Sequence, residues 1–171
     1  MKRALLVYNP ASGRKKAKRA HAIARVIEVF RAAGVDVEAV ATTHAGSAIQ
    51  QAREAAEAGY DTVIACGGDG TVNEALNGLV AASASAALGV VPLGSGNLLA
   101  SDLRLPFDPV AAAQQLLTYQ PRDFHPGTVT SLRNGAREKR CFLVAAGVGS
   151  DAELMYRTAV EAKERWGRNA Y

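Results

Sequence analysis

Cysteine is scarce, because the 171-residue sequence contains only Cys66 and Cys141. The three histidines show no ligand spacing with these cysteines, so a zinc site is not expected, and two isolated cysteines do not make a disulfide framework. Each cysteine lies in an apolar, strand-like run. The sequence therefore predicts two free thiols buried in strands.

Long apolar runs are also missing. No stretch approaches the roughly 20 consecutive apolar residues that a membrane-spanning helix needs. Residues 1–3 lead directly into a strand-like segment, without a signal-peptide pattern. About half of the residues are hydrophobic (49%), which is typical of a globular chain. We expect a cytoplasmic protein that meets membranes, if at all, peripherally at their surface.

Positive charge is in small excess, because the sequence has 20 basic and 16 acidic residues and a formal net charge of +4. This balance does not predict a nucleic-acid partner. Five of the basic residues, however, crowd into the segment RKKAKR at 14–19. The segment is either a solvated helix face or a surface that meets phosphates or an anionic membrane.

Strand-like and helix-like segments alternate along the first 120 residues. Ala20, Ile23, Ile27 and Phe30 recur at spacings of three and four, which indicates a helix packed on a sheet, and Gly34 follows as its C-terminal stop. The alternation predicts an α/β fold with a doubly wound parallel sheet and helices on both faces. The expected strands are 4–9, 35–41, 62–66 and 88–91, and the expected helices are 15–33, 47–59, a helix from 71 onward, 97–103 and 108–117.

Three of the expected helices carry start signals. Ser47–Gln50 and Thr71–Glu74 each match a capping box, in which a hydroxyl accepts from the amide three residues on and the later side chain reaches back. Asp108 before Pro109 is the third signal, with proline in the tolerated first turn.

The pattern changes after residue 119. Strands 124–132 and 140–146 are expected to pair antiparallel across a turn that contains Asn134-Gly135. A helix is then expected from Ser150 toward Trp166. We place a domain boundary near Pro121, so that residues 1–121 form the α/β domain and residues 122–171 begin an antiparallel β domain.

Three glycine-rich loops form the candidate site. NPASG (9–13) follows the first expected strand, GGDGT (67–71) the third and PLGSGN (92–97) the fourth. The carboxyl ends of parallel strands share one edge of the sheet, so the loops should converge there. Glycines let a phosphate approach the backbone, and the following helix presents free N–H groups, so the natural ligand is a polyphosphate.

Asp69 decides what kind of site this is. Its carboxylate would repel a polyphosphate unless it holds a divalent cation or accepts a proton from an incoming hydroxyl, and both roles indicate phosphoryl transfer. One such loop alone would be an ordinary tight turn, but three on one edge favour function over mere structure. The spacing is neither that of a Walker loop nor that of a Rossmann fingerprint.

Four motifs, in this order, resemble the diacylglycerol kinase catalytic domain family, which includes bacterial lipid kinases and the sphingosine kinases. They are NPASG at 9–13, TTHAGSA at 42–48, GGDGTVNEALNGL at 67–79 and PLGSGNLLASDL at 92–103. The resemblance implies ATP- and magnesium-dependent phosphorylation of a lipid hydroxyl. It also implies an α/β nucleotide domain of the phosphofructokinase and NAD kinase type, followed by a β-sandwich, with the lipid bound between them.

The resemblance further implies roles for single residues. Asp69 matches the carboxylate of the GGDG motif, which is the base in sphingosine-kinase-like members and helps to organise magnesium in others. The family's nucleotide contacts fall on Asn9, Thr42, residues 67–74 and Ser95. The full set of candidate ATP-binding residues is Asn9, Ser12, Gly13, Thr42, Gly67, Gly68, Asp69, Gly70, Thr71, Asn73, Glu74, Gly94, Ser95, Gly96 and Asn97.

The sequence departs from this family in two ways. Leu98 stands where many bacterial members have an aspartate tied into a magnesium network. Family members also continue well beyond this length, so we expect a chain truncated within the β-sandwich, whose open sheet edges favour a homo-oligomer or a completing chain. Two alternatives stay open: an NAD kinase-like enzyme, which shares GGDGT, and a non-catalytic nucleotide-binding fragment.

Overall fold

The computed structural model describes residues 1–10, 16–133, 135–147, 149–150 and 152–153. The part of the expected helix from Ser150 that follows Glu153 lies outside the described residues. Residues 119–126 connect the last helix to the second sheet without helix or strand. The elements are β1 (Arg3–Tyr8), α1 (Lys16–Ala32), β2 (Asp36–Ala41), α2 (Ser47–Glu57), β3 (Thr62–Gly67), α3 (Asp69–Ala81), β4 (Ala87–Pro92), α4 (Leu98–Asp102), α5 (Pro109–Thr118), β5 (Gly127–Arg133) and β6 (Ala136–Phe142).

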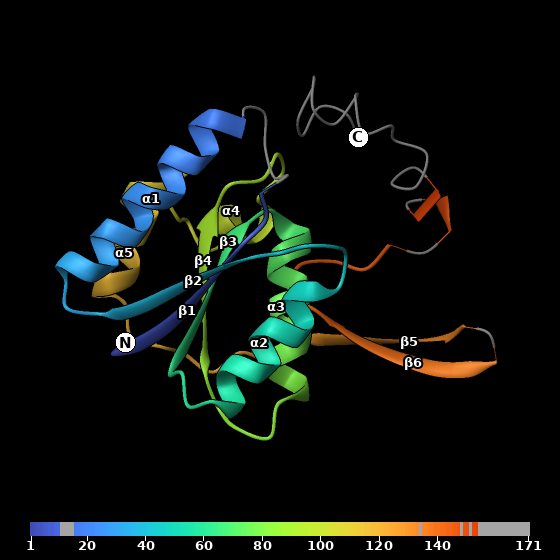
Figure 1. Cartoon of the computed structure of the whole chain (residues 1–171). Coiled ribbons are helices and arrows are strands. Elements are labelled where there is room, and N and C mark those ends of the chain that lie inside the picture. Colours follow the sequence, from blue (N-terminus) through green and yellow to red (C-terminus); the bar gives the residue numbers. More distant parts are fainter. Residues whose placement is uncertain (11–15, 134, 148, 151, 154–171) are drawn as a thin grey trace.

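The first four strands form one parallel sheet in the order β2-β1-β3-β4. Helices α2 and α3 cover one face, and α1 and α5 cover the other (Figure 1). All six residues of β3 are buried, as expected for a central strand covered on both faces. The doubly wound α/β sheet predicted from the sequence is confirmed.

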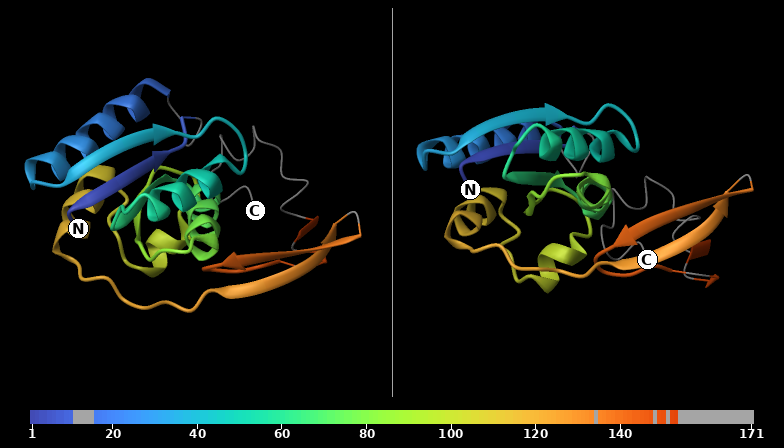
Figure 2. Two further views of the ribbon diagram at one scale, coloured as in Figure 1. Left: turned by 60° about the horizontal axis from the view of Figure 1, so that its bottom comes forward. Right: turned by 90° about the horizontal axis from the view of Figure 1, so that it is seen from below.

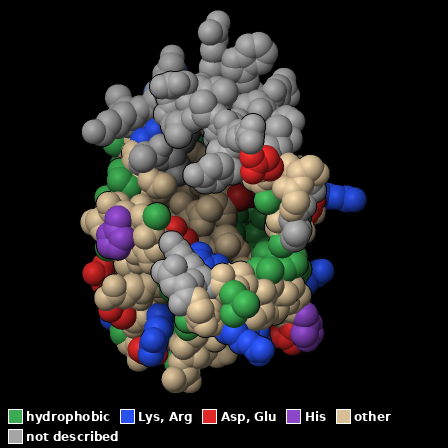
Figure 3. Space-filling model, turned by 90° about the vertical axis from the view of Figure 1, so that its right-hand side faces the viewer, with side chains coloured by type: hydrophobic (Ala, Val, Ile, Leu, Met, Phe, Trp, Pro, Cys, Tyr) green, Lys and Arg blue, Asp and Glu red, His purple; other side chains and the backbone are tan. Residues whose placement is uncertain are grey.

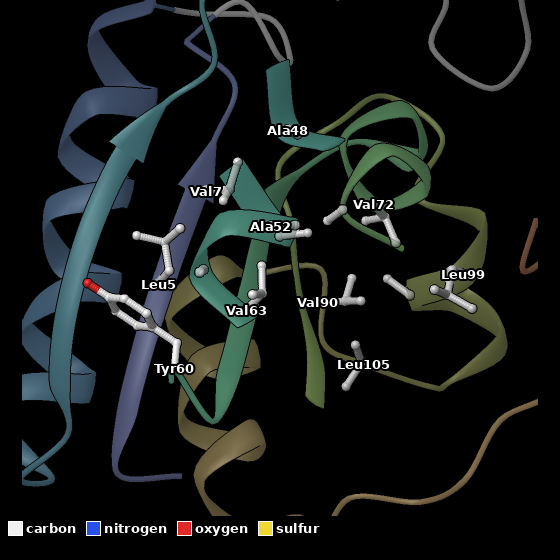
Figure 4. Packing of buried hydrophobic residues seen from close by; sticks show 14 residues of the cluster. Leu5, Val7, Ala48, Ala52, Tyr60, Val63, Val72, Val90, Leu99 and Leu105 are labelled. Carbon is white, nitrogen blue, oxygen red and sulfur yellow. The ribbon is translucent and has the colours of Figure 1, made fainter. Parts of the chain in front are cut away.

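Two apolar clusters lie on the two faces of the sheet, and alternate residues of each strand enter them. In β1, Leu5 and Val7 pack toward α2 and α3, whereas Ala4 and Leu6 pack toward α1 and α5 beside the fully buried Phe30. Figure 4 shows the first cluster, in which strand side chains meet small side chains of α2. These small residues let the helix lie close to the sheet.

Several predicted boundaries hold. Gly34 and Gly59 follow α1 and α2 with φ of +79° and +82°, a conformation that suits glycine at a helix end. The Asp108 side chain accepts from the Ala111 amide, with Pro109 in the first turn. No helix in the described part of the chain is long and apolar enough to cross a bilayer.

Strands β5 and β6 form a separate antiparallel sheet, a hairpin that projects from the α/β part (Figure 2). Arg133 pairs with Ala136, so the turn holds only two residues, and β6 begins at Ala136 instead of residue 140. The predicted start of β6 was therefore wrong. Gly135, at φ +80°, permits a two-residue turn that pairs even the polar residues beside it.

Both cysteines are free and buried, as predicted. Cys66 lies in β3 in the middle of the sheet, and burial raises the pKa of its thiol to about 12. Cys141 lies in β6 at the base of the hairpin and is 7% exposed.

Gly78 lies in the middle of α3 because α2 crosses directly over it. A Cβ added at Gly78 would lie 2.2 Å from the carbonyl oxygen of Ile49 and 2.9 Å from the Cβ of Ala52. Glycine normally weakens a helix interior. Here it lets the backbone of α3 lie close to the Ile49 carbonyl and the Ala52 side chain of α2.

We expect Gly78→Ala to lower the free energy of unfolding by about 1–3 kcal/mol, as in other overpacked sites, although alanine is the better helix former by roughly 1 kcal/mol. Urea unfolding followed by circular dichroism measures the change. Gly70→Ala in the same helix is the control, because a Cβ there meets nothing within 4 Å. Equal stability of the two variants would contradict the close α2–α3 contact.

Candidate functional site

The loops after the strands meet at one edge of the sheet and are joined there by backbone hydrogen bonds. The Thr42 amide donates to the carbonyl of Tyr8 (2.8 Å), and the Asn9 amide donates to the carbonyl of Cys66 (3.4 Å). The Leu93 amide donates to the carbonyl of Gly67 (2.8 Å). The structure therefore brings the expected loops together, while Ser12 and Gly13 lie outside the described residues.

The glycines at this edge are required mainly by contacts between the loops themselves. A Cβ on Gly94 would lie 2.3 Å from the Cα of Gly68, and one on Gly96 would lie 2.9 Å from Oδ2 of Asp69. A Cβ on Gly67 would lie 2.6 Å from Oγ1 of Thr71. The exception is Gly70, which faces open space and leaves the backbone accessible to a ligand.

The GSGN loop is closed by its own asparagine. Asn97 adopts φ +52°, a left-handed conformation that asparagine tolerates. Its Oδ1 accepts from the Gly94 amide and its Nδ2 donates to the Gly94 carbonyl, both at 2.9 Å. The Asn97 amide group thus shapes the loop next to Asp69.

Asp69 lies in the first turn of α3 and connects the two glycine-rich loops. Its Oδ1 accepts from the amide of Leu99 in the first turn of α4, at 3.3 Å. Asp69, Asn97 and Leu99 also line a small pocket at this edge. Figure 3 views the molecule from the side on which the hairpin projects, where the surface is hollowed beside hydrophobic side chains.

The N-terminus of α3 carries no side-chain cap, so the capping box predicted for Thr71–Glu74 was wrong. The helix begins at Asp69, with Gly68 in an extended conformation as its N-cap. Glu74 therefore lies well beyond the first turn and cannot reach back to it. The first amides of α3 keep their capacity to bind an anion.

Glu74 caps a different helix. Its Oε1 accepts from the Gly46 amide (2.8 Å) and its Oε2 accepts from the Ala48 amide (3.2 Å) at the start of α2. A carboxylate at this end also opposes the positive end of the helix dipole. Glu74 thus fixes the TTHAG loop against α3 and occupies the place that an anion would take at α2.

The capping box predicted at Ser47–Gln50 was wrong as well, although the helix does begin at Ser47. The N-cap is Gly46, at φ +91°, and it supplies no side chain. The Ser47 hydroxyl instead donates to the His44 carbonyl (2.8 Å) and accepts from the Thr43 amide (3.2 Å). Ser47 therefore shapes the loop that precedes α2.

At least one residue of the basic segment 14–19 has a structural role. Arg19 is buried in α1, with 8% exposure, and its guanidinium donates to the carbonyl of Pro10. Arg19 thereby ties the loop after β1 to α1. Lys18 is exposed.

A magnesium ion fits this edge only if a bound nucleotide supplies most of its ligands. Within the described ranges, no three His, Cys, Asp or Glu side chains lie close enough together to hold a metal ion. Asp69 is the carboxylate in the glycine-rich loops. Magnesium commonly binds one or two carboxylates together with substrate phosphates, which agrees with this arrangement.

Comparison with known proteins identifies the family. The sequence-family model of the diacylglycerol kinase catalytic domain matches residues 3–129. The chain belongs to the diacylglycerol kinase catalytic domain family. It is 39% identical to a diacylglycerol kinase of Bacillus subtilis and 33% identical to one of Staphylococcus saprophyticus, over 100% and 99% of its length.

A solved structure of this family has the same fold. The crystal structure of a diacylglycerol kinase from Bacillus anthracis superposes with a TM-score of 0.63 at 27% identity, covering 80% of this chain and 45% of that one. The chain spans about half the length of the curated relatives that it matches, 54% and 52% for those from B. subtilis and S. saprophyticus.

Sequence reasoning missed Asn77. Its side chain bonds to the backbone of Cys141 in β6, 64 residues further along the chain. The letters NGL after the GGDGT motif gave no sign of this contact, since asparagine in a helix is usually solvated.

The contact between Gly68 and Gly94 leads to one prediction. We expect Gly94→Ala to push the two loops apart and to weaken ATP binding by about tenfold or more, because even a small displacement of positioned groups is costly. Isothermal titration calorimetry measures the affinity. Gly135→Asn in the hairpin turn is the control, since asparagine tolerates the left-handed conformation of this residue (φ +80°) and a Cβ there meets nothing within 4 Å. Unchanged affinity in Gly94→Ala would show that the contact does not shape the site.

The capping role of Glu74 leads to a second prediction. Glu74→Gln keeps one acceptor oxygen but turns an NH2 group toward one of the two α2 amides, and an amide without an acceptor costs about 1–3 kcal/mol. We expect hydrogen exchange at Gly46 or Ala48 to become about tenfold faster or more. Glu57→Gln, which removes an exposed pair with Arg53, is the control. Unaltered exchange at both amides would contradict the cap.

Proposed function

We propose that the complete protein is an ATP- and magnesium-dependent lipid kinase, which transfers the γ-phosphate of ATP to the hydroxyl of a diacylglycerol-like or sphingoid lipid. The observation that carries the proposal is the uncapped start of α3 beside Asp69, at an edge where two glycine-rich loops touch. Membership of the diacylglycerol kinase catalytic domain family supports the reaction class.

In this proposal the phosphates of ATP lie on the first amides of α3, with Gly70 as the point of closest approach. Asn9, Thr42, Thr71, Asn73 and Ser95 are the remaining candidate contacts. The start of α2 is not a second phosphate site, since Glu74 already accepts from its amides. The proposal therefore places the triphosphate at the start of α3 and not at the start of α2.

Asp69 is the proposed catalytic residue. The lipid hydroxyl oxygen attacks the γ-phosphorus, the bond from that phosphorus to the β,γ-bridging oxygen breaks, and the proton of the hydroxyl passes to the Asp69 carboxylate. Because Oδ1 accepts from the Leu99 amide, the carboxylate is held in one orientation. A magnesium ion would be held by Asp69 together with the phosphates, where it would neutralise charge that develops during transfer.

A second candidate function is nucleotide binding without transfer, which the small second sheet of the described residues favours. The chain spans about half of its curated relatives, and the hairpin that follows the α/β part is a two-stranded sheet. Such a sheet is too small to enclose a lipid. We propose that this chain needs a further segment, a second copy or a completing chain for efficient turnover at a membrane surface.

One assay separates these candidates. Transfer of labelled γ-phosphate is measured with magnesium and, separately, diacylglycerol, sphingosine, NAD or no acceptor, with molecular mass followed by light scattering. Labelled lipid supports the lipid kinase, and labelled NAD supports the NAD kinase-like alternative. Nucleotide binding without any labelled acceptor supports the non-catalytic candidate, and no nucleotide binding overturns all three.

Asp69→Asn removes the proposed proton acceptor while keeping the size of the side chain. We expect phosphoryl transfer to fall by at least about a hundredfold, the usual effect of losing a general base, with ATP affinity largely retained. Asp123→Asn in the exposed connection before β5 is the matched control. Retained turnover in Asp69→Asn would remove Asp69 from the mechanism.

A further inference from the structure

Asn77 joins the α/β part to the second sheet through a side-chain amide with three hydrogen bonds. Its Nδ2 donates to the carbonyl of Asn73 one turn earlier (2.8 Å) and to the carbonyl of Cys141 (2.9 Å). Its Oδ1 accepts from the Cys141 amide (2.8 Å). Turning the amide over would place NH2 against N–H and oxygen against two carbonyls, so the hydrogen bonds fix its orientation.

The Asn77 amide acts toward β6 as a neighbouring strand would. It pairs with both the N–H and the C=O of one residue, as a strand partner does. Cys141 is 7% exposed at this point, and Leu143 just beyond it packs against the apolar cluster under α2 and α3. Farther out, Leu132 is 76% exposed. The hairpin is therefore held at its base and free of the α/β part toward its tip.

This contact lies on the same helix as the candidate catalytic carboxylate. Asn77 follows Asp69 by eight residues, which is about 12 Å along an α-helix. The Gly78 backbone is packed closely against α2 at this point, since a Cβ on Gly78 would lie 2.2 Å from the carbonyl oxygen of Ile49. A rigid element thus connects Asp69 at one end with β6 at the other.

We propose that Asn77 is a positioning residue, which sets the orientation of the β5–β6 sheet relative to Asp69. Its importance for catalysis rests on the proposed function, with the lipid bound between the two sheets as the family resemblance implies. The contact itself does not depend on that function. Nucleotide binding should not depend on Asn77, because Asp69, Asn97 and Glu74 hold the glycine-rich loops and α2 by separate hydrogen bonds.

The two thiols report on the contact. Asn77→Asp places one carboxylate oxygen, in place of Nδ2, against the carbonyls of Asn73 and Cys141, and Asn77→Ser removes the amide without adding charge. We expect maleimide to label Cys141 about tenfold faster or more in both variants, while Cys66, buried in the central strand, stays unlabelled. Peptide mapping by mass spectrometry distinguishes the two sites. Gln115→Glu, the same amide-to-carboxylate change on α5, is the control.

ATP affinity supplies the second readout. We expect the dissociation constant for ATP with magnesium to stay within about twofold of the wild-type value, because Asp69 lies about 12 Å from Asn77 along the helix and the bond from Asn77 to Asn73 goes to the backbone carbonyl. Unchanged labelling of Cys141 in both variants overturns the proposal. Labelling of both thiols together with weaker ATP binding also overturns it, because Asn77 would then serve general stability. If the wild-type chain does not bind ATP, the proposed function fails, while the Cys141 labelling still tests the contact.

Discussion

The candidate site depends on the contact between two glycine-rich loops, where a Cβ on Gly94 would lie 2.3 Å from the Cα of Gly68 and one on Gly68 would lie 3.1 Å from the Cα of Gly94. This contact sets the start of α3 against the loop that precedes α4, and it places Asp69 where its carboxylate can reach the Leu99 amide. Glycine is therefore needed here for the packing of the two loops against each other, independently of any ligand.

Three polar side chains of α3 connect the helix to three neighbouring elements by hydrogen bonds. Asp69 bonds to the start of α4, Glu74 bonds to the start of α2, and Asn77 bonds to β6. The two carboxylates satisfy amides at helix ends that would otherwise attract anions. The start of α3 itself has no side-chain cap. In the proposed function, the free amides at the start of α3 bind phosphate while a magnesium ion offsets the Asp69 carboxylate in the same turn, whereas Glu74 already accepts from the amides at the start of α2.

The sequence predicted most of the fold because its signals are local. Apolar periodicity located the strands and helices, and Gly34 and Gly59 marked helix ends through their own backbone conformation. The two capping boxes failed because glycines, at 46 and 68, occupy the N-cap positions. The roles of Glu74 and Asn77 could not be predicted, since their partners lie 26 to 64 residues away in sequence. The family resemblance gave the reaction class, but the residue-level chemistry stays a proposal.

The most direct test of the account is a titration of the isotopically labelled chain with ATP and magnesium, monitored by NMR through the chemical shifts of its backbone amides. The account predicts that the largest shifts occur at Gly70, Thr71 and the neighbouring amides that begin α3, and that Gly46 and Ala48 at the start of α2 move little. Shifts concentrated at α2, or no shifts at the glycine-rich loops, would contradict it.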